Sequence, residues 1–344
     1  MTDPKPRLIL TLGDPAGIGS ELVAKLLADR EAWDAAHVLI LGDEDELKDG
    51  MAIAGVDFPY RRVTDPAALG QAPDMPLFLS KGRSAPQTGW ARAEATTQGG
   101  QHCLDTLGFG LDLVAQGHAD ALVFAPLNKA SLHAAGMTQS DELHWFADRL
   151  GHNGTVSEIN VMEGLWTSRV TSHVALRDVA DLITEDKIIE ATRLIHAALR
   201  EAGHENPRIG VCGLNPHNGD NGNFGTEEIT IIGPAVERAK ALGLPVEGPY
   251  PSDTIFLKAV AKELDAIVTL YHDQGQIAIK LLGFWQGVTV QGGLPVPITT
   301  PAHGTAFDIR GQGKAHVGPM RAAWTIASTM GRRARSFKST QQVD

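Results

Sequence analysis

Cysteine is scarce in this sequence, which holds only Cys103 and Cys212 among its 344 residues. Two cysteines are too few for the disulfide framework of a small secreted protein. We therefore expect a protein of a reducing, cytoplasmic compartment. Cys212 lies in an apolar stretch, so its thiol is expected to be part of the core.

Long hydrophobic runs and an excess of positive charge are also absent. No apolar run is long enough to span a bilayer, and the first residues, MTDPKPR, show no signal-peptide pattern. The formal net charge is −11, which argues against a nucleic-acid-binding protein and favours an acidic soluble enzyme. We expect neither a nucleic-acid partner nor a membrane partner.

The apolar residues, 43% of the chain, suffice for two domains or one large α/β unit. Strand-like and helix-like segments alternate, and this alternation predicts a mostly parallel sheet. The predicted strands cover residues 7–12, 36–41, 76–80, 121–125, 159–162, 168–174, 208–214, 266–270 and 287–291. The predicted helices cover residues 20–28, 96–115, 185–202, 227–242, 255–263 and 318–330.

A glycine-rich turn, GDPAGIG at residues 13–19, joins the first predicted strand to the first predicted helix. This geometry aims free backbone N–H groups at an anion or a cofactor. The turn lacks the G-x-G-x-x-G spacing, which disfavours an ordinary Rossmann site. A tight turn that only packs the helix on the strand is an equal alternative.

The stretch from Ala266 to Lys280, AIVTLYHDQGQIAIK, combines a buried strand with titratable side chains. His272 and Asp273 come just after the strand, and Lys280 follows in an apolar segment. Open α/β proteins bind their ligands at the carboxyl ends of strands. We expect Lys280 to bind a substrate anion or relay a proton.

Three histidines, His173, His217 and His272, each stand at or just past the end of a predicted strand. Since strand ends of one sheet face the same crevice, the three imidazoles could converge there. Such a set suits zinc or another borderline divalent ion, with Asp253 and Asp273 as further ligands or as groups that orient the ligands. From the residues alone, a hydrolase or an aldolase fits as well.

Several longer motifs follow one another in order along nearly the whole chain. They are GDPAGIGSE at 13–21, APLNKASLHAAG at 125–136, TSHVALRD at 171–178, GLNPHNGDNGNFGTEE at 213–228, GPYPSDTIF at 248–256, YHDQGQIAIK at 271–280 and HGTAFDIRGQGKA at 303–315. Together they resemble the 4-hydroxythreonine-4-phosphate dehydrogenase family, which belongs to pyridoxal phosphate biosynthesis.

This resemblance implies an oxidoreductase that uses NAD or NADP and a divalent metal ion to oxidise a hydroxyl next to a carboxylate, with decarboxylation of the product. It implies the fold of isocitrate and isopropylmalate dehydrogenases, two α/β/α domains with a cleft between them, in a homodimer. The expected cofactor-side domain is discontinuous and covers residues 1–135 and 313–344. Residues 136–312 are expected to bind metal and substrate and to form the dimer interface.

The resemblance also assigns residues to roles. It places the metal on His173, His217 and His272, possibly across a subunit boundary, and the substrate on Lys280. Zinc is preferred, with cobalt, magnesium and manganese as alternatives. Catalytic roles are expected for Lys280, Asp253 and Asp273. The expected cofactor-binding residues are Gly13, Asp14, Gly17, His303, Gly304 and Ala306.

Four positions depart from the family at its substrate contacts. Glu142 and Leu143 stand for a histidine and a threonine, Thr289 for an asparagine and Ile298 for an arginine. Losing an arginine removes a bidentate fork for an anion. The substrate, a small anionic hydroxy acid, therefore has alternatives: a cis-dihydrodiol carboxylate of the terephthalate type or an acid-sugar phosphate. A metal-binding protein without redox activity is the alternative of another class.

Overall fold

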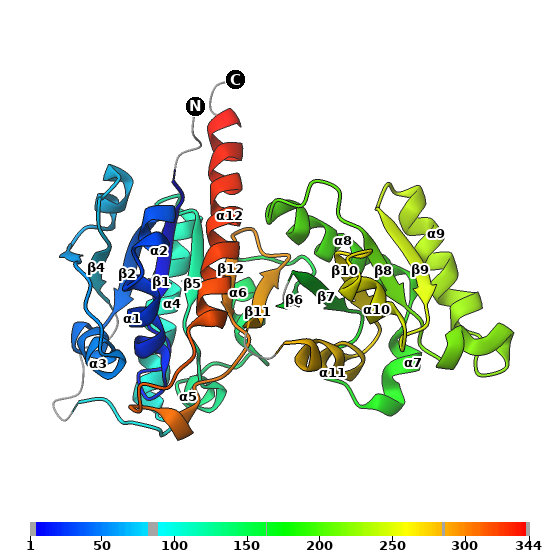
Figure 1. Cartoon of the computed structure of the whole chain (residues 1–344), viewed down its shortest axis with the longest axis horizontal. Coiled ribbons are helices and arrows are strands. Elements are labelled where there is room, and N and C mark those ends of the chain that lie inside the picture. Colours follow the sequence, from blue (N-terminus) through cyan, green and yellow to red (C-terminus); the bar gives the residue numbers. More distant parts are fainter. Residues whose placement is uncertain (1–4, 82–88, 163, 284–285, 342–344) are drawn as a thin grey trace. The chain divides into compact units, whose positions relative to one another are not determined.

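The structure is a computed structural model that describes residues 5–81, 89–162, 164–283 and 286–341, with side chains up to residue 336. The chain separates into two compact units (Figure 1). The first unit comprises Met1–Asn153 and Leu294–Asp344, and the second unit comprises Gly154–Gly293. Each unit combines strands and helices, as expected of an α/β protein.

The boundaries of the units differ from the expected ones, which fell after residues 135 and 312. Helix α6 (Glu142–Arg149) belongs to the first unit, because its Phe146 is buried there with a ring 5.6 Å from that of Phe124. Strand β12 (Ile298–Pro301) belongs there too, since it pairs with β5 (Ala121–Phe124). Packing of these two elements therefore extends the first unit at both junctions.

The first unit contains a parallel sheet with the strand order β3-β4-β2-β1-β5-β12. Its central strands are runs of Leu, Ile and Val that are buried on both faces, which is typical of a parallel sheet covered by helices. The other strands are β1 (Arg7–Thr11), β2 (His37–Gly42), β3 (Arg61–Arg62) and β4 (Leu77–Ser80). The other helices are α1 (Gly19–Leu27), α2 (Arg30–Ala35), α3 (Glu44–Ala54), α4 (Thr97–Ala115), α5 (Lys129–Ala134) and α12 (Gly318–Gln341).

The second unit contains strands in the order β11-β6-β7-β10-β8-β9. The pairs β11/β6 and β6/β7 are antiparallel, and the remaining pairs are parallel. These strands are β6 (Ser157–Met162), β7 (Leu165–Arg169), β8 (Ile209–Cys212), β9 (Val246–Tyr250), β10 (Ala266–Thr269) and β11 (Val288–Gly292). The helices are α7 (Val179–Leu182), α8 (Glu185–Glu201), α9 (Gly233–Ala241), α10 (Ile255–Val260) and α11 (His272–Leu282).

The core confirms one prediction about the cysteines. Cys212 is fully buried in a cluster of the second unit with Ile267 and Ile279, and burial raises the pKa of its thiol. In the described residues, no helix is both long and apolar enough to cross a membrane.

Candidate functional site

His272 lies at the first position of α11, directly after the turn that follows β10. Gln274 secures this turn, because its side-chain oxygen accepts a hydrogen bond of 2.7 Å from the Leu270 amide. His272 Nδ1 lies 2.7 Å from Asp273 Oδ1, so the ring donates its Nδ1 proton to the carboxylate. The other ring nitrogen, Nε2, is then left with a lone pair suited to a metal ion.

His173 lies beside His272 although 99 residues of sequence separate Thr171 from Leu270, the residues that connect their loops. The Thr171 hydroxyl donates to the Leu270 carbonyl oxygen at 2.8 Å, and the Thr171 amide donates to the same oxygen at 3.1 Å. The centroids of the two imidazole rings are 5.8 Å apart. Rings that share one tetrahedral zinc, with Zn–N bonds of about 2.0–2.1 Å, have centres roughly 5–6 Å apart. The separation of the two rings is therefore compatible with a shared metal ion.

His217 follows β8 in a turn with unusual backbone angles. Residues 217–221 all have positive φ, at 54°, 56°, 74°, 43° and 56°. A left-handed run costs roughly 1–2 kcal/mol for each residue other than glycine, so surrounding contacts must hold it. Asn218 Nδ2 donates to the Pro249 carbonyl at 2.8 Å. Glu228 accepts hydrogen bonds from the Leu214 and Asn215 amides at 2.7 and 2.6 Å.

The structure thus brings together two of the three histidines predicted to bind metal. His217 is exposed, and among the described residues no three His, Cys, Asp or Glu side chains form a group that could hold one metal ion. Lys280 is exposed on α11, eight residues after His272 and therefore close to the same helix face. Asp253 is exposed in the turn before α10.

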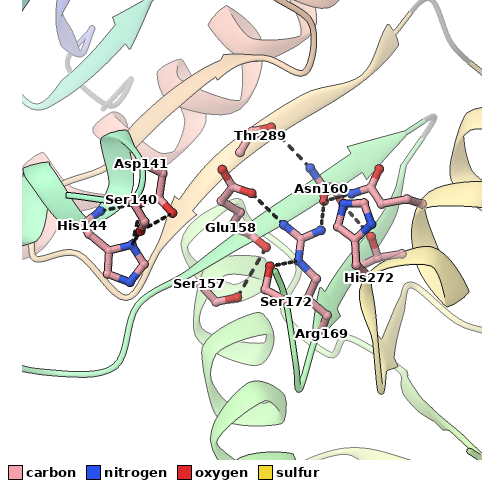
Figure 2. A network of polar contacts seen from close by, with 12 residues as sticks. Ser140, Asp141, His144, Ser157, Glu158, Asn160, Arg169, Ser172, His272 and Thr289 are labelled. Atoms are coloured by element: carbon pink, nitrogen blue, oxygen red, sulfur yellow. Dashed lines mark hydrogen bonds and ion pairs between the residues drawn. The ribbon is translucent and has the colours of Figure 1, made fainter. Parts of the chain in front are cut away.

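A buried polar network that was not predicted from the sequence lies in the second unit, centred on Arg169 (Figure 2). The side chain of Arg169 is only 6% exposed, and its Nη2 lies 2.7 Å from Glu158 Oε2. Its Nη1 donates to Asn160 Oδ1 at 3.1 Å. The only signal in the sequence was a charged residue within a predicted strand, 168–174.

Two of the four positions that depart from the family are packed in the core of the first unit. Leu143 is 2% exposed and Ile298 is 0% exposed, which differs from the substrate contacts expected there. Glu142 is partly exposed on α6. Thr289 is buried on β11, and its hydroxyl oxygen accepts a hydrogen bond of 3.3 Å from Asn160 Nδ2.

The first unit brings together the two segments predicted to bind the cofactor. The Ile18 amide in the glycine turn donates to the Thr305 carbonyl at 3.1 Å. Gly17 permits this approach, because a Cβ atom there would lie 2.8 Å from the Thr305 Cβ. Gly13 has φ of +79°, and a Cβ there would lie 2.6 Å from the Pro126 carbonyl oxygen. Glycine is thus required at both places by close backbone packing.

Asp14, His303, Gly304 and Ala306 complete this region. Asp14 is buried, and its Oδ1 accepts a hydrogen bond of 2.9 Å from the Ala16 amide. Burial raises the pKa of Asp14 despite this bond. Burial also lowers the pKa of His303, whose Nδ1 lies 3.0 Å from the Gly304 carbonyl oxygen. Gly304 is exposed with no atom within 4 Å of a Cβ added there, and Ala306 has φ of 44°.

A cavity of about 610 Å³ lies elsewhere in the second unit, beside β8 and β9. None of the predicted site residues lines it. Its Arg208 and Glu263 are paired with Asp265 and Lys258, and its Tyr250 donates to Glu247. Its size alone does not make it the functional site, because these groups already satisfy one another.

Comparison with known proteins identifies the family. Residues 34–327 match the model of the family described as pyridoxal phosphate biosynthetic protein PdxA. The chain belongs to the PdxA family. The resemblance drawn from the motifs is thereby confirmed.

Relatives in the PdxA family include a protein of Pseudomonas aeruginosa called putative 4-hydroxythreonine-4-phosphate dehydrogenase 2. It is 58% identical over 332 residues, which cover 95% of this chain and 97% of that protein. A D-threonate 4-phosphate dehydrogenase of Pectobacterium atrosepticum is 36% identical and covers 90% of this chain and 94% of its own. Both names describe dehydrogenases, so the prediction of an oxidoreductase that uses a nicotinamide cofactor is confirmed.

Solved structures confirm the predicted fold. The 4-hydroxythreonine-4-phosphate dehydrogenase of Klebsiella pneumoniae has a TM-score of 0.82 and 32% identity, and it covers 96% of this chain and 100% of its own. A β-decarboxylating dehydrogenase of Thermococcus kodakarensis has a TM-score of 0.50 and 13% identity, and it covers 98% and 99% of the two chains. The latter likeness concerns the fold alone.

Proposed function

We propose that this PdxA-family dehydrogenase oxidises the secondary hydroxyl of a small phosphorylated hydroxy acid, with 4-hydroxythreonine 4-phosphate as the leading substrate. D-threonate 4-phosphate, an acid-sugar phosphate, is the second candidate, because a relative 36% identical to this chain carries that name. The observation that carries the proposal is the paired His173 and His272 at 5.8 Å, with Lys280 on the same helix as His272. Two imidazoles and a cation suit a substrate that bears both a hydroxyl and an anion.

The proposed metal is one divalent ion, with zinc preferred and cobalt, magnesium or manganese as alternatives. Bound to the histidines, it supplies the Lewis acidity that lowers the pKa of a substrate hydroxyl and favours loss of CO2 after oxidation. Asp273 accepts a hydrogen bond from His272 Nδ1, which leaves Nε2 as the nitrogen that would hold the ion. Lys280 binds the substrate anion, and Asp253 is a further candidate for proton transfer.

We propose that the protein forms a homodimer and that His217 has its role at the dimer interface. In the described part of the chain, every exposed large apolar side chain belongs to the second unit, which supports a partner surface there. These side chains are Val174, Leu176, Phe224, Ile229, Leu242, Leu257, Val260, Ile277, Leu281 and Leu282. Since His217 lies outside the His173–His272 pair, we propose that a second copy brings its own His217 to that pair.

The cofactor is proposed to bind the first unit at the glycine turn and the loop at residues 303–306. The contact between Ile18 and Thr305 supports this, because one ligand could then touch both segments. Partly exposed Glu142 and the Asn160-bonded Thr289 are proposed to contribute to substrate selection, whereas Leu143 and Ile298 would shape the site from the core. The buried free thiols of Cys103 and Cys212 support a cytoplasmic location.

A substrate screen at the NADH absorbance tests the proposal. Purified protein would receive 4-hydroxythreonine 4-phosphate, D-threonate 4-phosphate or a cis-dihydrodiol carboxylate, with NAD or NADP and each of the four metals. We expect metal-dependent reduction of the cofactor with one of the two phosphates. Turnover of the cis-dihydrodiol carboxylate alone would show that the substrate is a diol carboxylate and not a phosphorylated hydroxy acid. Absence of turnover together with absence of saturable NAD or NADP binding would favour a metal-binding protein without redox activity.

A further inference from the structure

Arg169 is a buried arginine with a hydrogen bond from each guanidinium nitrogen. Nη2 contacts Glu158 Oε2 at 2.7 Å, Nη1 contacts Asn160 Oδ1 at 3.1 Å and Nε contacts Ser172 Oγ at 3.1 Å. Arginine is rarely buried unless it is paired, because removing its charge from water is costly. Its three partners lie on β6 and on the segment after β7, so one rigid fork joins both.

Asn160 passes this connection on to α11 and β11. Its Oδ1 accepts from Arg169 and also from Gln276 Nε2, the latter at 2.6 Å. Its Nδ2 donates to the hydroxyl of Thr289, the residue directly opposite it in the β6–β11 pair. Both the oxygen and the nitrogen of the Asn160 side-chain amide are therefore hydrogen-bonded, and the network joins β6, β7 and β11 to α11. Figure 2 shows Arg169, Asn160 and Thr289 within it.

The ends of this network lie next to the two histidines along the chain. Ser172 immediately precedes His173, and Gln276 lies four residues after His272 and four before Lys280. On a helix, residues four apart share a face, so Gln276 anchors the face that presents His272 and Lys280. The strand pairing of β6, β7 and β11 does not itself require a hydrogen bond at Ser172 or at Gln276.

We propose that Arg169 and Asn160 are positioning residues for the metal and substrate site. Their network sets the distance and orientation of the His173 and His272 rings and of the α11 face that carries Lys280. The inference rests on the proposed function and names residues that act through the histidines without touching the ion. It predicts that the positions of both histidine rings change when the hydrogen bonds of the network are removed at either end.

The test compares Arg169→Met and Gln276→Met with a matched control, Arg208→Met. Arg208 also forms a two-pronged contact with a carboxylate in the second unit, to Asp265 at 3.0 and 2.9 Å, but on the surface. Co2+ is titrated into each full-length protein, and its visible absorption spectrum reports the ligand geometry. We expect both network variants to bind Co2+ about 10- to 100-fold more weakly, with an altered spectrum, and the control to match wild type.

Gln276→Met serves as the second variant because it removes one link at a partly exposed residue and leaves Arg169 paired. Arg169→Lys should recover little of the Co2+ affinity that is lost in Arg169→Met, since an ammonium group cannot reach three partners at once. If folded Gln276→Met and Arg169→Met proteins bind Co2+ with wild-type affinity and spectrum, the proposal is wrong. Circular dichroism verifies folding in every case.

A second measurement separates this inference from the proposed function. Histidine-selective 15N labelling of the metal-free proteins reports the ring environments of His173 and His272 directly. We expect both signals to move in Gln276→Met and to stay in place in Arg208→Met. Wild type that binds no Co2+ while these signals still move would refute the proposed metal and keep the positioning role; signals that do not move would overturn the positioning role itself.

Discussion

The Asp141 carboxylate holds the backbone and the ring of His144 at the same time. Its Oδ1 accepts from the His144 amide at 3.0 Å and lies 2.6 Å from the ring Nδ1, while Asp141 caps α6. Burial alone would raise the pKa of Asp141. The hydrogen bonds from His144, its charge and the Ser140 hydroxyl together lower the pKa below the ordinary 3.8.

Asp141→Ala should therefore destabilise the protein in a pH-dependent way. A depressed folded-state pKa adds stability above the unfolded value of 3.8, and this stability is lost as pH falls through the lower folded-state value. We expect a loss of about 1 kcal/mol in the free energy of unfolding near neutral pH, as for other helix caps, and a smaller loss in acid. Urea denaturation at several pH values measures it. Exposed Asp74→Ala is the control, and an equal effect of both variants would contradict the prediction.

Glu46→Gln should change the pH dependence in the opposite sense. Glu46 is buried in α3 with Oε2 at 3.5 Å from His102 Nε2, and burial raises its pKa although His102 offsets part of the rise. The stability that neutral Glu46 contributes is fully present below its unfolded-state pKa of 4.5. It declines as pH rises toward the higher folded-state pKa. As pH rises above 4.5, wild type should lose more stability than Glu46→Gln. The control Glu94→Gln, at an exposed position, should show the same pH dependence of stability as wild type.

Two glycine variants probe the cofactor loop. A Cβ at Gly304 would meet no atom within 4 Å, so Gly304→Ala should leave the melting temperature unchanged. If the dinucleotide lies against this loop, the added methyl group should still raise the KM for NAD or NADP several-fold. Gly17→Ala should lower both the melting temperature and cofactor affinity, because its Cβ would lie 2.8 Å from Thr305 Cβ. Unchanged cofactor KM in Gly304→Ala would place the cofactor elsewhere.

Single histidine variants test the metal ligands. His173→Ala and His272→Ala should each lower zinc affinity and turnover by at least about 10-fold, since each removes a proposed ligand. Exposed His118→Ala, in the first unit, should behave as wild type. Zinc content after dialysis is the measurement. Treatment of wild type with a chelator should abolish turnover, and added zinc should restore it; turnover that survives chelation would contradict the metal requirement.

Gly100→Ala should destabilise the packing of α4 against α5. A Cβ at Gly100 would lie 1.9 Å from the Ser131 carbonyl oxygen, and backbone cannot move away as a flexible side chain can. Overpacking of this kind costs about 1–3 kcal/mol. Gly70→Ala is the matched control, because nothing lies within 4 Å of its added Cβ. Thermal unfolding followed by circular dichroism should separate the two variants.

Much of the fold could be predicted because parallel strands are buried on both faces and leave continuous apolar runs. Strands β1, β2, β5 and β10 were found this way. Three strands were not predicted: β3 is two arginines, β9 contains Gly and Pro, and β12 is half threonine. Their strand state depends on neighbours, such as the pairing of Ile298 with Leu122.

The candidate site also has features that local sequence predicts and features that depend on tertiary contacts. The sequence by itself determined the family and singled out the histidines and the glycine turn as candidate site residues, because motifs depend on residue type and local order. Only the tertiary structure decided that His173 meets His272, that Leu143 and Ile298 are core residues and that Asn160 supplies an amide opposite Thr289. Contacts between residues about a hundred positions apart arise from strand order and register, which no local pattern encodes.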